Sequence, residues 1–194
     1  MRDPIAETLA NRIIRTHSYI NSVVIDLTEE GICLRPAQTA PPIGWHVWHI
    51  SRWADWFQAS FPQGEQIWET QNWQDKLSMS SDKLGPMQTG MTMEHDDAAN
   101  VPKLLGKTNL IDYMESVFQA NEDVLNKLSL EDFYAPRESF AKWRYVDGQV
   151  VRAKGQDVLL IDDIGYHFAH ANRHLGMIEA LVGASLQQSG TVSI

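Results

Sequence analysis

Residues 164–176 read IGYHFAHANRHLG and contain three of the seven histidines of this 194-residue chain. At about 100° per residue, His167, His170 and His174 share one face of an α-helix. The same face carries apolar residues of a longer pattern, namely Leu160, Ile164, Ala171, Ile178 and Leu181. The spacing predicts a long amphipathic helix that begins after Gly155-Gln156-Asp157 and points the three imidazoles into the protein core.

Three more segments show helical periodicity. The first begins at Asp3-Pro4, which is typical of an N-cap followed by proline, and continues to about Leu27. The second covers about Pro42 to Phe61 and ends because Pro62 cannot continue a helix. The third begins at Thr108, which can cap it, and continues to about Leu128.

The two connections around the third helix differ in character. Residues 62 to about 107 lose the periodicity and contain several glycines and prolines, which predicts a long crossover with short helical turns. A connection of this length is uncommon unless it covers a site or joins opposite ends of the fold. Before the fourth helix, Asp147-Gly148 separates two β-prone arms, Trp143 to Val146 and Gln149 to Arg152, and predicts a small hairpin.

The expected fold class is therefore all-α. We expect a four-helix bundle with a long crossover between helices 2 and 3 and a small β-hairpin before helix 4. At 194 residues we expect a single domain over residues 1–194.

Composition and charge exclude several classes of protein. A net charge of −9 repels phosphate backbones and no Lys and Arg cluster stands out, so nucleic acid is not an expected partner. The longest aliphatic run is about four residues, at 158–161, which is too short for a membrane span. The first residues lack the pattern of a signal peptide, and Cys33 is the only cysteine, so we expect a cytoplasmic protein without a disulfide.

Clustered histidines on apolar helix faces favour metal binding. A buried imidazole without a partner costs roughly 1–3 kcal/mol, and a divalent cation removes this cost for several rings together. His170 and His174, one helical turn apart, can bind the same cation. The second helix carries WHVWHIS at 45–51, in which either His46 or His49 can supply a third ligand. A hydrogen-bonded histidine network without metal is the alternative.

The spacing also restricts the metal chemistry. No Asp or Glu lies three residues before any histidine, which argues against a di-iron carboxylate site, and the His-Glu-x-x-His motif is missing. Three neutral imidazoles suit Zn²⁺ or Ni²⁺ and leave a coordination position open, which suggests catalysis. His17 and His95 have no companion at ligand spacing and are not expected to bind metal.

Two stretches resemble a known family. PIGWHVWHISRW at 42–53 and HANRHLG at 170–176 are similar to the helix-two and helix-four motifs of the DinB-like superfamily of bacterial four-helix bundles. The resemblance implies that His49, His170 and His174 bind the metal, with His46 and His167 as neighbours. It also implies a homodimer, and a relationship to transferases or isomerases that use a low-molecular-weight thiol such as mycothiol, bacillithiol or glutathione.

Several other residues are candidates for the surroundings of this site. Asp163 can orient His167 as a hydrogen-bond acceptor, Tyr166 can donate a proton near the metal, and Cys33 can be a reactive thiol or an inert buried one. Gly176 costs about 1 kcal/mol relative to alanine in mid-helix, which favours close helix approach or clearance for a ligand. Aromatic and methionine side chains that can line or cover the pocket, or simply fill the core, are Trp45, Trp48, Trp53, Trp56, Met79, Met87, Met91 and Met93.

These observations lead to one function hypothesis and one alternative from another class. The first is a metal-dependent enzyme, a thiol S-transferase or hydrolase, that activates a low-molecular-weight thiol or water for transfer to a small electrophilic substrate. The second is a non-catalytic binding or stress-response module in which the metal only joins helices two and four.

Overall fold

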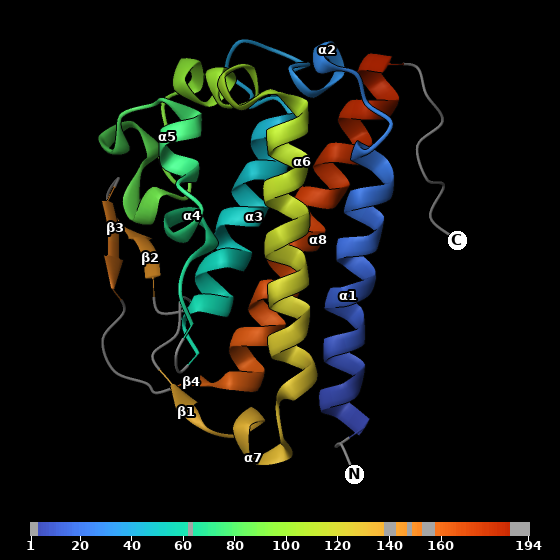
Figure 1. The fold of residues 1–194 in the computed structure, drawn as a ribbon, viewed down its shortest axis with the longest axis vertical. Helices are drawn as coiled ribbons and strands as arrows, with labels where there is room; N and C mark the ends of the chain where they lie inside the picture. Colours follow the sequence, from blue (N-terminus) through green and yellow to red (C-terminus); the bar gives the residue numbers. More distant parts are fainter. Residues whose placement is uncertain (1–3, 62–63, 138–142, 147–148, 153–157, 187–194) are drawn as a thin grey trace.

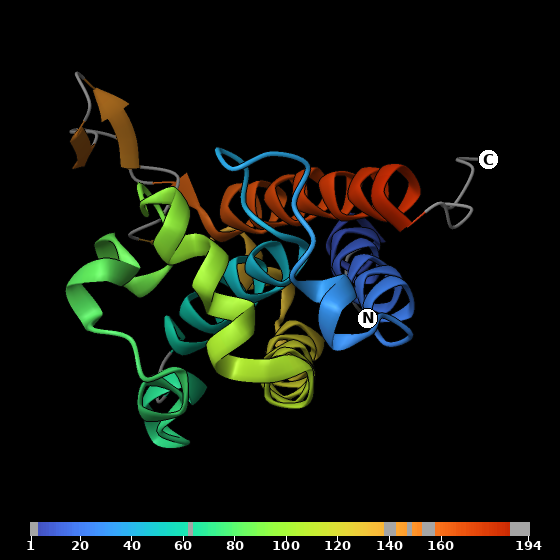
Figure 2. The same ribbon diagram turned by 90° about the horizontal axis from the view of Figure 1, so that it is seen from above.

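The structure is a computed structural model that describes residues 4–61, 64–137, 143–146, 149–152 and 158–186. Four long helices lie side by side and form a bundle (Figures 1 and 2): α1 (Pro4–Val24), α3 (Ile43–Ala59), α6 (His95–Lys127) and α8 (Leu160–Leu186). Helix α3 packs against α6 and α8, and α1 packs against the same two helices. The all-α four-helix bundle expected from the sequence is confirmed.

The direction of the helices explains the long connection. Helices α1 and α8 run one way in Figure 1, whereas α3 and α6 both run the other way. Because α3 and α6 are parallel, the chain between them must return along the whole bundle. It does so through short helical turns, as expected: α4 (Ile67–Thr70), α5 (Trp73–Leu77), and two 3₁₀ turns, η1 (Ser81–Leu84) and η2 (Pro86–Gln88). The remaining short helices are α2 (Glu29–Ile32) and α7 (Leu130–Phe133).

The small hairpin is also present. Strand β2 (Trp143–Val146) pairs antiparallel with β3 (Gln149–Arg152), with Val146 opposite Gln149. The Asp147-Gly148 turn and the Gly155–Asp157 start of the fourth helix lie outside the described residues. A second antiparallel pair, β1 (Pro136–Arg137) with β4 (Val158–Leu159), was not expected and leads directly into α8.

The predicted start of the third helix at Thr108 lies just beyond a break in α6, and an additional helical segment precedes this break. Helix α6 begins at His95 and is interrupted at Gly106, where φ is +71° and ψ is 160°. Beyond this break the Lys107 amide donates to both carboxylate oxygens of Glu29, at 3.0 and 2.9 Å. A carboxylate from α2 therefore caps the second part of α6, and residues 95–105, which the sequence assigned to the crossover, are helical.

Pro102 does not end this helix, and it makes a close contact with α3. Pro102 is buried in the first part of α6 and lies against Gly44 of α3. A Cβ at Gly44 would come within 2.6 Å of the Pro102 Cβ. The proline that sequence analysis interpreted as a helix breaker is a packing residue, and Gly44 makes room for it.

The inward face of α8 follows the predicted pattern. Leu160, Ile164, Ala171 and Ile178 are buried, and Leu181 is half-buried. Helix α1 deviates at its ends: Asp3 lies outside the described residues, Ile5 is exposed, and the helix stops at Val24, so that Leu27 reaches the core from the following turn. Among the described helices, none is both long and apolar enough to cross a membrane.

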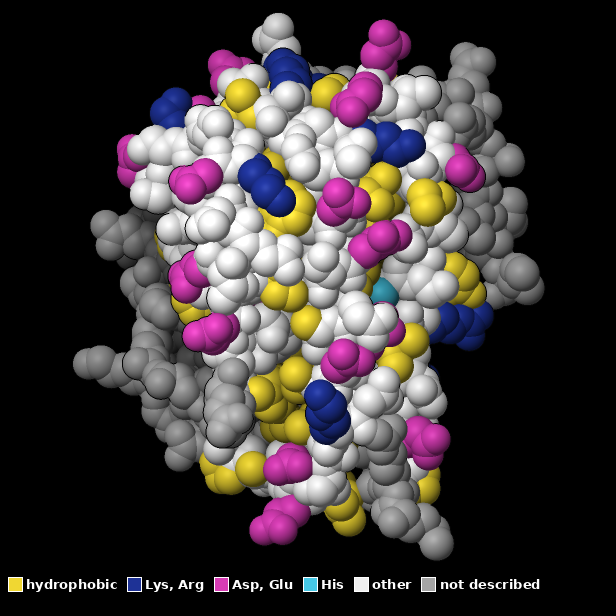
Figure 3. Space-filling model, viewed as in Figure 1, with side chains coloured by type: hydrophobic (Ala, Val, Ile, Leu, Met, Phe, Trp, Pro, Cys, Tyr) yellow, Lys and Arg dark blue, Asp and Glu magenta, His cyan; other side chains and the backbone are white. Residues whose placement is uncertain are grey.

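The molecular surface carries charges of both signs. On the face shown in Figure 3, acidic side chains are scattered among lysines and arginines, and only a small area of histidine surface is visible. His46 and His49 on α3 and His167 and His174 on α8 are buried, which directs attention to the interior between these two helices.

Candidate metal centre

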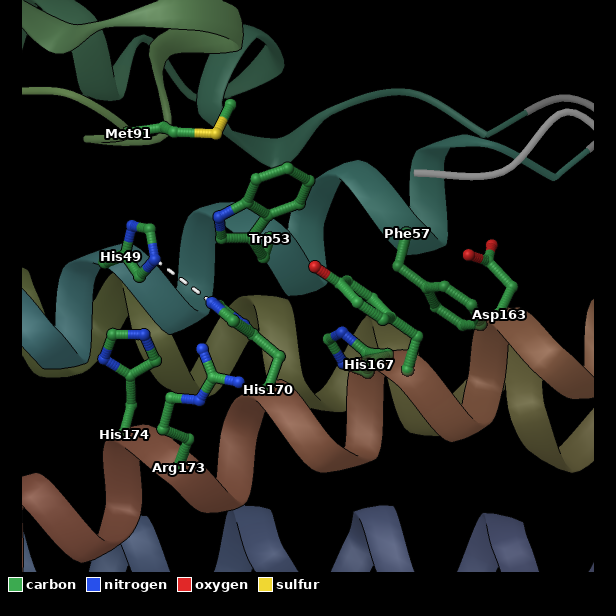
Figure 4. A pocket seen from close by; sticks show the side chains of 10 residues that line it. His49, Trp53, Phe57, Met91, Asp163, His167, His170, Arg173 and His174 are labelled. Atoms are coloured by element: carbon green, nitrogen blue, oxygen red, sulfur yellow. Dashed lines mark hydrogen bonds between the residues drawn. The ribbon is translucent and has the colours of Figure 1, made fainter. Parts of the chain in front are cut away.

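Three histidines from two helices meet inside the bundle (Figure 4). His49 comes from α3, and His170 and His174 come from successive turns of α8. One ring nitrogen of each lies within 4.8 Å of the others, so the group could hold a metal ion. The Nε2 atoms of His49 and His170 are 3.2 Å apart. The convergence that the helix spacing predicted is present.

A backbone carbonyl orients His49. Its Nδ1 donates a hydrogen bond to the carbonyl oxygen of Thr89, which lies in the crossover. The Trp45 ring stacks on the imidazole, with ring centroids 4.6 Å apart and planes 11° apart. A proton held at Nδ1 leaves a lone pair at Nε2, which is the nitrogen that faces His170. This outer contact is the kind that fixes metal-binding histidines in proteins.

His46, the other candidate for the third ligand, lies next to the three histidines and forms a hydrogen bond with His174. Its Nδ1 lies 2.9 Å from Nδ1 of His174, and one of the two nitrogens donates to the other. When Nδ1 of His174 is the donor in this hydrogen bond, its Nε2 keeps the lone pair that a cation needs. The structure therefore separates His46 from His49, which sequence spacing alone left open.

Burial keeps these imidazoles neutral. Desolvation lowers the pKa of His49 to about 3, with a smaller contribution from His170, and lowers the pKa of His46 to about 4. Desolvation likewise lowers the pKa of His170 to about 4. It lowers the pKa of His174 even more, and the neighbouring histidines lower that pKa further. At neutral pH the rings are in the unprotonated form that binds metal, so a cation does not have to displace protons.

The donor set fits a divalent cation. Two imidazole nitrogens bound to tetrahedral Zn²⁺ at about 2.0–2.1 Å lie about 3.3 Å from each other. The 3.2 Å between Nε2 of His49 and Nε2 of His170 agrees with this separation. Three neutral nitrogen donors suit Zn²⁺, Ni²⁺ or Cu²⁺ better than the oxygen-seeking Mg²⁺ or Ca²⁺.

A pocket of about 260 Å³ opens beside the three histidines, between α3 and α8. Trp53, Phe57 and Met91 give it apolar walls, and Met91 belongs to the crossover, which thus covers part of the site as expected. The histidines lie at one end of the pocket and Asp163 lies at the other (Figure 4). A ligand in this pocket would be next to a metal held by His170.

The structure divides the tryptophan and methionine candidates. Trp53 and Met91 line the pocket, whereas Trp48 and Met79 are buried in the core. The remaining side chains hold the crossover in place, because Trp45 Nε1 donates to the Met93 sulfur at 3.4 Å and Trp56 Nε1 donates to the Met87 carbonyl at 2.8 Å.

Other sequence candidates differ from their expected roles. Asp163, the expected hydrogen-bond acceptor for His167, is almost fully buried, at 1% exposure. Tyr166 is 51% exposed at the pocket rim. Burial raises the pKa of the Cys33 thiol, which makes it less reactive. An added Cβ at Gly176 would meet no protein atom within 4 Å, so close helix approach does not explain this glycine.

Sequence analysis missed a second histidine pair. His17 is buried, its ring stacks on Phe118 at 3.9 Å, and its Nδ1 lies 3.0 Å from Oε1 of Glu122. Its ring edge faces His167, with centroids 6.4 Å apart. Burial lowers the pKa of both histidines. Spacing within one helix could not reveal this pair, but the place of His17 on the apolar face of the first helix was a usable signal.

A buried ion pair, also missed, anchors the crossover beside His49. Arg52 and Asp55 on α3 are at most 1% exposed and lie 3.0 Å apart. Arg52 Nε donates to the Gln88 carbonyl at 2.8 Å, directly before the Thr89 carbonyl that accepts from His49. The arginine therefore fixes the segment that orients a candidate metal ligand.

Comparison with protein families matches residues 12–178 to the DinB superfamily. The chain belongs to this superfamily. Among solved structures, this DinB chain is similar to the crystal structure of a conserved protein from Enterococcus faecalis, with a TM-score of 0.74 and 15% identity, over 97% of this chain and 99% of that chain. At this identity the likeness shows the fold alone. A comparison with curated proteins found no match for the DinB chain.

Proposed function

We propose that the protein is a metal-dependent enzyme in which His49, His170 and His174 bind one divalent cation, Zn²⁺ or Ni²⁺. It activates a low-molecular-weight thiol or water for transfer to a small electrophile. The observation that carries the proposal is the position of the three imidazoles at the end of a pocket, because a cation bound there keeps a face open to a reactant.

The chemistry follows from the donor set. A divalent cation in this position supplies a Lewis acid and lowers the pKa of a thiol or water bound to it. The surrounding residues orient the ligands, because Thr89 accepts a hydrogen bond from His49 and His46 bonds to His174. Trp53 and Phe57 make one side of the pocket apolar and thereby exclude water. Membership of the DinB superfamily supports the metal, and the resemblance described above suggests the thiol and the homodimer.

Metal analysis of matched variants tests the ligand set. The purified protein is expected to contain about one divalent ion per chain, and His170→Ala should lose it. His95→Ala is the control, because it removes an exposed histidine at the start of α6. Full occupancy in His170→Ala would refute the assignment. A conjugation assay with several thiols and electrophiles then tests turnover.

The second candidate function is a binding module in which the metal only joins α3 and α8. It is supported by the packing of the donor rings among buried core residues, such as the Trp45 ring on His49. A purely structural site is closed, so chelation should lower the melting temperature sharply and no exogenous ligand should perturb the metal. For the enzyme we expect a smaller stability loss and a change in the Co²⁺ absorption spectrum when a thiol is added.

A further inference from the structure

Two side chains at the rim of the pocket have donor groups that bond to no side chain or backbone group in the described part of the chain. Tyr166 and Arg173 both line the pocket and are exposed to solvent. They are seven residues apart on α8, which is two helical turns, so they lie on the same face of this helix. Among the described residues, none forms a hydrogen bond or an ion pair with either side chain.

The same two residue types behave differently elsewhere in the bundle. On α1, Arg15 donates through Nε and NH2 to the Tyr19 hydroxyl, at 3.0 and 2.6 Å. That pair is one turn apart and each side chain satisfies the other. Arg173 and Tyr166 are too far apart along α8 for this arrangement and border a cavity instead, so their donors are available to a ligand.

The cavity defines the size and shape of that ligand. A volume of about 260 Å³ corresponds to roughly nine water-sized groups at about 30 Å³ each, which suits a molecule with a single ring. Trp53, Phe57 and Met91 provide aromatic and thioether surfaces that favour a flat apolar body. Asp163 lies at the end away from the histidines, so the position for an anionic group is the Arg173 end (Figure 4).

We propose that this pocket binds a small carboxylic acid with a flat apolar body. Its carboxylate pairs with Arg173 and Tyr166, and its body lies against Trp53, Phe57 and Met91. The planar guanidinium group suits a carboxylate because it can donate two parallel hydrogen bonds. The inference rests on the proposed function only in taking this carboxylic acid as the electrophilic reactant. Binding of the acid itself requires no metal.

Benzoate is the probe that tests this binding, and benzamide is its neutral counterpart of equal shape. Ligand-observed NMR measures both affinities for the protein as purified and again after chelation of any metal. We expect saturable benzoate binding at millimolar concentrations in both preparations, tighter than that of benzamide and weakened by added salt because Arg173 is exposed.

Substitutions at the rim separate the pocket from nonspecific binding. Arg173→Gln should weaken benzoate about tenfold and remove its preference over benzamide, and Tyr166→Phe should weaken it several-fold. The matched controls Arg15→Gln and Tyr19→Phe remove the same groups from α1 and should change nothing. All four positions are exposed, so each variant is expected to fold.

Two results would overturn the inference. One is the absence of saturable benzoate binding by the unsubstituted protein, and the other is unchanged affinity and selectivity in Arg173→Gln. Because the chelated protein is measured as well, a failure of the metal assignment leaves these affinities interpretable. Conversely, if the protein contains its metal but does not bind benzoate, the proposed function stands and the carboxylic acid substrate class is refuted.

Discussion

Removal of the Asp55 carboxylate should be among the most damaging single changes in the bundle. Asp55 is fully buried and accepts hydrogen bonds from Arg52 NH1 at 3.0 Å, from the Tyr113 hydroxyl at 2.9 Å and from the amide of Trp68 at 2.8 Å. It also accepts from Gln58 Nε2 and the amide of Ile67. In Asp55→Ala all these donors lose their acceptor, and the Arg52 guanidinium stays buried without a counter-charge.

The size of the effect follows from this geometry. Breaking a buried ion pair by removing one partner costs about 3–5 kcal/mol, and each buried donor left without an acceptor adds about 1–3 kcal/mol. A domain is typically stable by about 5–15 kcal/mol, so Asp55→Ala should come close to unfolding the protein. Tyr113→Phe removes only one hydroxyl and should cost about 1–3 kcal/mol.

Urea denaturation followed by tryptophan fluorescence measures these losses in the free energy of unfolding. The control is Asp97→Ala, which removes a surface ion pair of similar length, since Lys83 Nζ lies 2.9 Å from Asp97 and is half-exposed. Such a solvent-exposed pair contributes little to stability, because water and salt screen it. If Asp55→Ala loses no more stability than Asp97→Ala, the reasoning about this network is wrong. Tyr113→Phe provides a measurable value if Asp55→Ala does not fold.

The remaining predictions concern pH, glycines and the orientation of His49. The pKa values of His46 and His170 are lowered to about 4 and that of His49 to about 3, below the value near 6.5 in the unfolded chain. Below pH 6.5 the unfolded state therefore binds protons that the folded state does not, so stability is complete above pH 6.5 and falls toward pH 4. At about pH 5.5 each such histidine lowers the free energy of unfolding of the metal-free protein by about 1.4 kcal/mol relative to pH 8. Urea denaturation curves at pH 5.5 and pH 8 measure this difference, and equal stability at the two pH values would contradict it. Gly176→Ala should raise the melting temperature and add up to about 1 kcal/mol of stability, because the new Cβ meets no protein atom within 4 Å. Gly44→Ala should lower the melting temperature, because its Cβ would collide with Pro102. The opposite order of melting temperatures would refute both arguments. Thr89→Pro keeps the carbonyl that accepts from His49 but distorts the crossover around it, so metal affinity measured by competition with a chelator should fall about 10–100-fold, while Thr89→Ser should leave it unchanged.

Periodicity predicted the parts of the fold that depend on local spacing. The four helices, the α8 stripe and the hairpin arms follow from the recurrence of apolar residues along the chain and from Asp147-Gly148. The first part of α6, residues 95–105, did not follow from periodicity, and neither did the Glu29 cap on its second part nor the packing of Pro102 against Gly44. These contacts join segments far apart in the sequence, so local patterns carry no trace of them.

The candidate site shows the same division. Spacing placed His170 and His174 on one face, and it offered both His46 and His49 from the second helix without distinguishing them. The distinction depends on the Thr89 carbonyl, a backbone atom with no side-chain signature. Arg52 was missed for a related reason, since a charged residue in a helix is usually solvated and only the returning crossover buries it.

The stacking of Trp45 on His49 gives the protein an intrinsic optical probe. An indole 4.6 Å from the imidazole should change its emission when that ring takes up a proton or a cation, and a paramagnetic ion such as Cu²⁺ should quench it strongly. Metal titrations can therefore be followed in unlabelled protein, and Trp45→Phe separates the response of this indole from that of Trp53, whose ring lies 5.8 Å from that of His170.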